Sequence, residues 1–179
     1  MTTPIEEIPT GVDIDFFSQG QRQSFRDFLE ISSDVQVIGH VGRLAREKNL
    51  LYLSQSIALY LQKEPRAVFL VIGDGPNKED IQSIFKQKDL SDRLILAGKK
   101  TGQALADAYK AMDLFVFAST SETQGMVLTE AMAAGKPIIA LEASGVREVV
   151  RDNENGRLLA ETSSPADFAL AVKDYFQDR

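Results

Sequence analysis

The chain has 179 residues, of which 44% are hydrophobic and 26% charged, and its formal net charge is −6. This profile is typical of one globular domain with a sizeable core, and no apolar run approaches the roughly 20 residues that span a bilayer. Cysteine is absent and His40 is the single histidine, which excludes disulfides and thiolate metal sites and disfavours a histidine metal cluster. The acidic balance and the lack of a basic patch argue against nucleic acid as a partner.

Short apolar runs alternate with stretches of helical periodicity along the chain. The apolar runs predict strands at residues 35–41, 67–73, 93–98, 113–119, 137–141 and 156–159. The helical stretches cover about residues 49–61, 76–88, 101–111 and 125–134, a short segment near Arg147, and residues 165–176. Thr101 is a candidate helix cap, and Ser164-Pro165-Ala166-Asp167 resembles a capping box with proline at the first helical position.

The predicted strands are continuous apolar runs, as expected for strands that are buried on both faces. We therefore predict an α/β, Rossmann-like, three-layer domain, with a six-stranded parallel sheet and helices on both faces, over residues 34–179. Residues 1–33 fit this scheme poorly and are interpreted as a linker that contains IPTGVD, followed by a surface helix within residues 19–30. In such sheets ligands bind beyond the carboxyl ends of the strands, so the loops there hold the candidate site.

Two of these loops carry glycines or cations. GRLAREKN, residues 42–49, places Arg43 and Lys48 where a strand ends and a helix begins, which suits an anion; a solvated charged loop is the alternative that spacing alone favours. GDGPNK, residues 73–78, holds Gly73 and Gly75 but has Lys78 where a dinucleotide fingerprint needs a third glycine. This segment is either a plain turn or one that lets a ligand approach the backbone.

The stretch TQGMVLTEAMAAGKPIIAL, residues 123–141, has Glu130 and Lys136 as its only charged side chains. A carboxylate on so apolar a helix needs hydrogen-bond donors, which either protein groups or the vicinal hydroxyls of a sugar or ribose could supply. Glu122 precedes the helix, and the amides of Gly125, Met126 and Val127 would form its N-terminus, which suits phosphate. A catalytic pair of carboxylates for glycoside hydrolysis fits less well than ligand binding.

Two further features favour structural explanations. His40 lies in a predicted strand, where a packed histidine is the better interpretation than a catalytic one. Glu142, Arg147 and Glu148 fit surface charges, while Gly145 suggests a close backbone approach.

In this order, the motifs resemble the C-terminal, nucleotide-sugar-binding domain of family 4 retaining glycosyltransferases, which have the two-domain GT-B fold. IPTGVD resembles the segment that leads into this domain, GRLAREKN its Arg/Lys loop, and GDGP the turn after the second strand. SETQGMVLTEAMAAGKPIIA resembles the family motif of two glutamates separated by seven residues, which is the most specific of the set. GVREVV and NGRLL fit as well, whereas Ala143-Ser144-Gly145 stands where many relatives have two glycines. The resemblance covers about residues 8–176.

The resemblance implies roles for individual residues. Arg43 and Lys48 would hold the donor diphosphate and stabilise its charge as it leaves, and Glu122 would contact the transferred sugar; these three are the candidate catalytic residues. Glu130 would accept hydrogen bonds from the ribose hydroxyls. The predicted nucleotide-sugar site as a whole comprises Gly42, Arg43, Lys48, Gly73, Gly98, Lys99, Glu122, Gly125, Met126, Val127 and Glu130, with Gly98 and Lys99 near the base.

The family also implies a reaction. A hexose would move, with retention, from a nucleoside-diphosphate sugar, expected to be UDP-linked, to an acceptor hydroxyl, and no metal or cofactor would be needed. Family members have an N-terminal acceptor domain for which this sequence has no counterpart, so we expect a donor-binding half that transfers little sugar alone. The expected location is cytoplasmic, with peripheral contact at the inner face of the membrane through the missing domain. Alternatives are a stand-alone nucleotide-binding or regulatory module without catalysis, and a Rossmann-type oxidoreductase domain, against which the missing glycine fingerprint counts.

Overall fold

A single parallel sheet organises the structure, a computed structural model that describes residues 11–122 and 124–178. Within these residues the sheet has six strands in the order β3-β2-β1-β4-β5-β6. The strands are β1 (Gln36–Val41), β2 (Ala67–Ile72), β3 (Leu94–Gly98), β4 (Leu114–Phe117), β5 (Ile138–Leu141) and β6 (Arg157–Leu159). The predicted six-stranded parallel sheet is confirmed.

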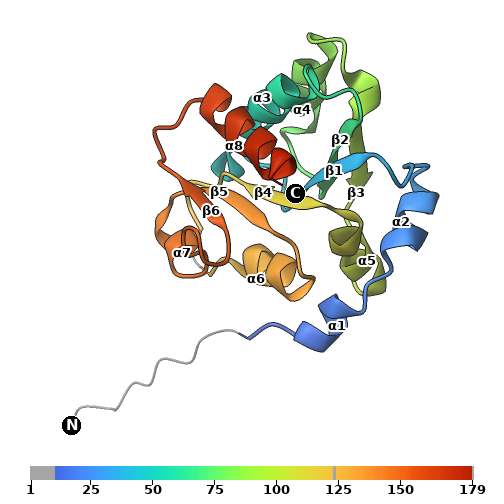
Figure 1. Cartoon of the computed structure of the whole chain (residues 1–179), viewed down its shortest axis with the longest axis vertical. Helices are drawn as coiled ribbons and strands as arrows, with labels where there is room; N and C mark the ends of the chain where they lie inside the picture. Colours follow the sequence, from blue (N-terminus) through green and yellow to red (C-terminus); the bar gives the residue numbers. More distant parts are fainter. Residues whose placement is uncertain (1–10, 123, 179) are drawn as a thin grey trace.

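Helices cover both faces of this sheet (Figure 1). One face carries α3 (Leu50–Leu61), α4 (Lys78–Lys86) and α8 (Pro165–Gln177). The other carries α1 (Ile14–Ser18), α2 (Arg22–Phe28), α5 (Gln103–Ala111), α6 (Met126–Ala133) and α7 (Ser144–Arg147). Two short 3-10 turns, η1 (Arg46–Lys48) and η2 (Ser91–Arg93), complete the described elements.

The strands are buried on both faces, which explains their unbroken apolar sequence. In β1, Ile38 belongs to the apolar cluster under α3 and α8, whereas Val37 and Val41 belong to the cluster under α5 and α6. All three side chains are buried. Since successive side chains of a strand point to opposite faces, only a run without polar positions fills both clusters.

Predicted caps differ in outcome. Ser164 forms the capping box, because its hydroxyl accepts from the amide of Asp167 and the carboxylate of Asp167 accepts from the amide of Ser164. The cap predicted at Thr101 is wrong. The N-cap of α5 is Gly102, with a φ of 55°, and no side chain caps this helix. The positive φ explains why glycine stands there.

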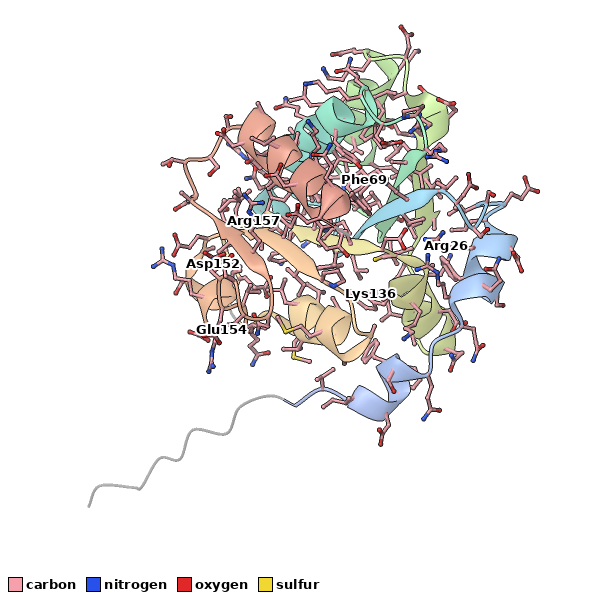
Figure 2. The ribbon with its side chains drawn as sticks, in the orientation of Figure 1. Arg26, Phe69, Lys136, Asp152, Glu154 and Arg157 are labelled. Atoms are coloured by element: carbon pink, nitrogen blue, oxygen red, sulfur yellow. The ribbon has the colours of Figure 1, made fainter. Side chains whose placement is uncertain are left out.

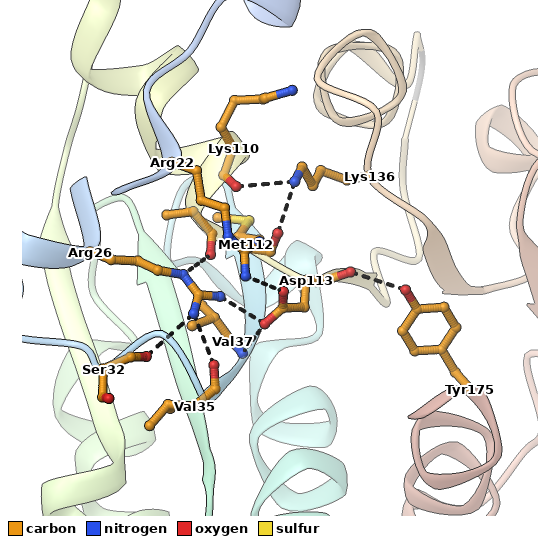
Figure 3. A network of polar contacts seen from close by, with 11 residues as sticks. Arg22, Arg26, Ser32, Val35, Val37, Lys110, Met112, Asp113, Lys136 and Tyr175 are labelled. Carbon is orange, nitrogen blue, oxygen red and sulfur yellow. Dashed lines mark hydrogen bonds and ion pairs between the residues drawn. The ribbon is translucent and has the colours of Figure 1, made fainter. Parts of the chain in front are cut away.

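The surface helix expected within residues 19–30 corresponds to α2, and a second short helix precedes it. Both helices, α1 and α2, lie before β1, and Arg26 of α2 is fully buried. Its guanidinium donates to the carbonyl oxygens of Ala111 and Val35 and to the carboxylate of Asp113 (Figure 3). In Figure 2, Arg26 lies beside α2, on the opposite side of the view from the charged group of Asp152, Glu154 and Arg157 near β6. The first three residues of IPTGVD lie outside the described residues.

The direction in which successive strands are added to the sheet reverses at β1. Its neighbours are β2 on one side and β4 on the other, so the chain leaves β1 toward one edge of the sheet and later returns to build toward the other edge. Loops that follow strands on either side of this point diverge and leave a crevice beyond the carboxyl ends. The fold therefore places the loops after β1, β2, β3 and β4 around one candidate site.

Candidate nucleotide-sugar site

A cavity of about 450 Å³ lies at this crevice. It is lined by Val41, Gly42, Arg43, Ile72, Gly73, Asp74, Lys99, Lys100, Leu105, Val127 and Glu130. Six members of the predicted site are among them: Gly42, Arg43, Gly73, Lys99, Val127 and Glu130. The fold thus brings one carboxylate of the paired-glutamate motif together with cations from two separate loops.

The glycine turn after β2 is shaped by the neighbouring loop. A Cβ on Gly73 would lie 1.8 Å from the carbonyl oxygen of Gly42, and one on Gly75 would lie 2.5 Å from that of Leu44. Hydrogen bonds from Leu44 N to Asp74 O and from Asn77 N to Leu44 O, both 2.9 Å, join the two loops. A close approach does explain these glycines, but the approaching backbone is that of the protein.

The Arg43–Lys48 segment is fixed beside the end of β4. The hydroxyl of Ser119 donates to the carbonyl oxygen of Glu47 at 3.1 Å. Arg43 is exposed and lines the cavity, and Lys48 is directed to Glu122, with 2.9 Å between Nζ and Oε2. Lys48 is therefore held at the site, which a freely solvated loop does not explain, whereas Arg43 borders the cavity as an exposed side chain.

Lys48 and Glu122 form a partly buried ion pair, with side chains 21% and 13% exposed. Burial opposes ionisation of Glu122, but the hydrogen bond and charge of Lys48, with the amide of Gly125, together hold the pKa of this carboxyl below its ordinary value. The Gly125 amide donates to Glu122 Oε1 at 3.2 Å. Of the predicted helix-end amides, the one on Gly125 is thus bound to a side chain in this structure.

Glu130 occupies a half-buried position on α6. Its Oε2 accepts from the hydroxyl of Tyr109 at 2.7 Å, so a protein donor does serve one of its oxygens. Burial raises the pKa of Glu130, and the hydrogen bond from Tyr109 partly offsets this. Among the described residues no hydrogen bond reaches Oε1, and the side chain lines the cavity. A protein donor therefore accounts for Oε2, and a ligand in the cavity is the remaining explanation for Oε1.

Besides Lys48, Glu122 and Gly125, two residues of the predicted site lie outside the cavity lining. Gly98 uses its carbonyl oxygen to accept from Gly73 N at 3.1 Å, and Met126 lies in the first turn of α6. His40, predicted to be packed, is fully buried with Nδ1 3.1 Å from the carbonyl oxygen of Val116. Burial lowers the pKa of His40 to about 4, which keeps its ring neutral.

The loop after β5 carries the predicted surface charges. Arg147 Nε lies 2.8 Å from Glu142 Oε1, and both side chains are well exposed. Gly145 is buried in α7, and its carbonyl oxygen lies 3.4 Å from the position of a Cβ on Gly125. This is an ordinary van der Waals separation, so the close approach at Gly145 stays a prediction.

Sequence reasoning missed Tyr109, Asp74, Lys100 and Leu105. Asp74 and Lys100 adjoin predicted residues and could have been found from the loop positions. Tyr109 and Leu105 lie on α5, which contributed no motif, and only the packing of α5 beside α6 brings them to the site.

A family model described as "Glycosyl transferases group 1" matches residues 21–179. The chain belongs to this family. The group 1 glycosyltransferase domain is 31% identical over 156 residues to the alpha-monoglucosyldiacylglycerol synthase of Streptococcus pneumoniae, which covers 84% of the chain and 35% of that relative.

Two solved structures share the fold of this glycosyltransferase domain. The C-terminal domain of the group 1 glycosyltransferase LpcC from Francisella tularensis has a TM-score of 0.82 at 27% identity, over 94% of this chain and 89% of that one. HepE from Anabaena, crystallised with UDP and glucose, has a TM-score of 0.82 at 24% identity, over 94% of this chain and 46% of that one. The fold is therefore that of the C-terminal half of GT-B enzymes.

The glycosyltransferase chain spans 22% to 39% of the length of several curated relatives it matches. In the part of the chain that the structure describes, none of the helices has the length and apolar character needed to cross a bilayer.

Proposed function

We propose that this domain binds the nucleotide-sugar donor, a UDP-linked hexose, for a retaining glycosyltransferase that acts on an acceptor hydroxyl. The observation that carries the proposal is the cavity at the carboxyl ends of β1, β2 and β3. It joins a half-buried carboxylate, Glu130, to the cations Arg43, Lys99 and Lys100. A nucleoside diphosphate offers vicinal ribose hydroxyls to the carboxylate and phosphate charge to the cations.

The Lys48–Glu122 ion pair beside the cavity has one member suited to the leaving diphosphate and one suited to the transferred sugar. An ammonium has three N–H donors, so Lys48 can keep its bond to Glu122 while donating to a diphosphate. Arg43 and Lys48 would stabilise the negative charge that develops on the departing diphosphate, and Glu122 would contact the transferred hexose. These side chains can supply the positive charge that a metal provides elsewhere, so the proposal includes no metal or cofactor.

The relatives support the substrate class. HepE was crystallised with UDP and glucose, and a pneumococcal O-GlcNAc transferase of similar fold was crystallised with UDP and GlcNAc. The length of the relatives supports a second, acceptor-binding domain outside this chain, so that the isolated domain would bind donor and transfer little sugar. We also propose a cytoplasmic location with peripheral membrane contact through that other domain, and the diacylglycerol product in one relative's name supports the membrane contact.

Calorimetric titration of the chain with UDP, GDP, ADP and NAD tests the proposal. We expect one nucleoside diphosphate, UDP, to bind more tightly than the other three. Binding of NAD in preference to all three diphosphates, or of none of the four, would overturn the donor site. Appreciable sugar transfer by the purified chain alone would refute the division of labour between domains, and an inverted anomeric centre in the product of the longer enzyme would refute retention.

A further inference from the structure

Tyr109 reaches the site from α5, a helix outside every motif of the sequence. Its side chain is fully buried, and its hydroxyl oxygen lies 2.7 Å from Glu130 Oε2 and 3.3 Å from the carbonyl oxygen of Val127. A phenol has one proton to donate, and the shorter contact to the charged acceptor takes it.

The ring of Tyr109 is held from two sides. Phe17 of α1 meets it edge-on with the ring centres 5.6 Å apart, and Phe115 of β4 packs against it at 5.7 Å. Because the ring has little freedom in this packing, its hydroxyl is a fixed donor. Glu130, by contrast, has three side-chain torsions and would otherwise sample several positions at the cavity.

We propose that Tyr109 is a positioning residue for donor recognition: it binds Oε2 of Glu130 and thereby presents Oε1 to the ribose hydroxyls. The inference rests on the proposed function, because it takes Glu130 as the ribose acceptor. Within the described residues no group donates to Oε1, and Glu130 lines the cavity, so this carboxylate has one oxygen for the protein and one for the ligand.

The same hydrogen bond favours the charged form of Glu130, which is the form that accepts from two hydroxyls. Burial acts in the opposite direction and raises the pKa of this carboxyl. Tyr109 remains a donor throughout, because burial and then the charge of Glu130 raise its own pKa well above the ordinary value. The other charged groups that line the cavity with Glu130 are Arg43, Asp74, Lys99 and Lys100.

Tyr109→Phe removes the hydroxyl and keeps the ring. Tyr60→Phe is a matched control, because Tyr60 donates a partly buried hydrogen bond to Gln36 at the start of β1, the end of the strand opposite the site. In the ligand-free chain, carbon NMR of the Glu130 carboxyl should show the titration midpoint rising by about half a pKa unit or more in Tyr109→Phe, the shift expected from one typical hydrogen bond. It should stay unchanged in Tyr60→Phe. An unchanged midpoint in Tyr109→Phe would overturn the inference.

The second readout is the binding affinity for UDP and for its 2′,3′-dideoxy analogue, measured by calorimetric titration. We expect Tyr109→Phe to weaken UDP binding about 5- to 10-fold, the scale of one typical hydrogen bond, and to leave the weaker binding of the analogue unchanged. Equal loss for both ligands would indicate a merely structural role and refute the inference. If the unmodified chain binds neither ligand, the proposed function fails and the inference with it. If the chain prefers UDP to the analogue but Tyr109→Phe binds UDP equally well, only the inference fails.

Discussion

Removal of the Asp113 carboxylate should destabilise the domain more than any surface change. Asp113 accepts from Arg22, from the fully buried Arg26 and from the amide of Val37, each at 2.8 Å (Figure 3). Asp113→Ala would leave the charge of Arg26 and the Val37 amide without this acceptor. Breaking a buried charge pair from one side costs about 3–5 kcal/mol, so we expect a loss of that size in the free energy of unfolding.

Urea and thermal denaturation measure this loss. For a chain of this size, it corresponds to a fall in Tm of roughly 10 °C, with an unchanged dependence on urea if the folded state keeps its compactness. Asp174→Ala is the matched control, because Asp174 pairs with Arg157 at 3.4 Å with both side chains exposed, and should cost no more than about 1 kcal/mol. A loss below about 1 kcal/mol for Asp113→Ala would refute the reasoning that this network anchors α2 to the sheet.

Three further results are expected. Lys48→Ala and Glu130→Ala should each weaken nucleotide binding by roughly 1.5–3 kcal/mol in calorimetry, and unchanged affinity in both folded variants would contradict the site. His40 has a pKa of about 4 in the folded chain against an ordinary 6.5, so the folded chain binds fewer protons and loses stability as pH falls from 6.5 through 4. Denaturation at several pH values should show that His40→Leu removes roughly 2–3 kcal/mol of this acid dependence; parallel curves for the two proteins would count against it. Gly73→Ala should destabilise by roughly 2–4 kcal/mol, because its φ is 147° and the new Cβ would strike a backbone oxygen, whereas Gly102→Ala, at φ 55° with open space, should cost about 1 kcal/mol. Similar losses for the two alanine variants would show that steric contact is not the cause.

The helices and strands were largely predictable, because the periodicity that defines them is local. The run predicted from Ala67 to Gly73 contains β2 (Ala67–Ile72), and Ser164 and Asp167 form the predicted capping box of α8. Prediction failed where a residue's role comes from distant parts of the chain. Arg26 looks like a surface charge in sequence. It is buried because the fold brings it into contact with Asp113, a residue far from it in the chain.

The sequence by itself determined the sheet class, the loops that hold the candidate site, and the spacing of Glu122 and Glu130. These depend on apolar runs and on residues that are near one another in the chain. Only the tertiary structure decided that Lys48 pairs with Glu122 and that Tyr109 binds Glu130. Those contacts join residues separated by 74 and 21 positions, and they exist because the parallel sheet sets the loop after β1 beside the one after β4 and packs α5 against α6.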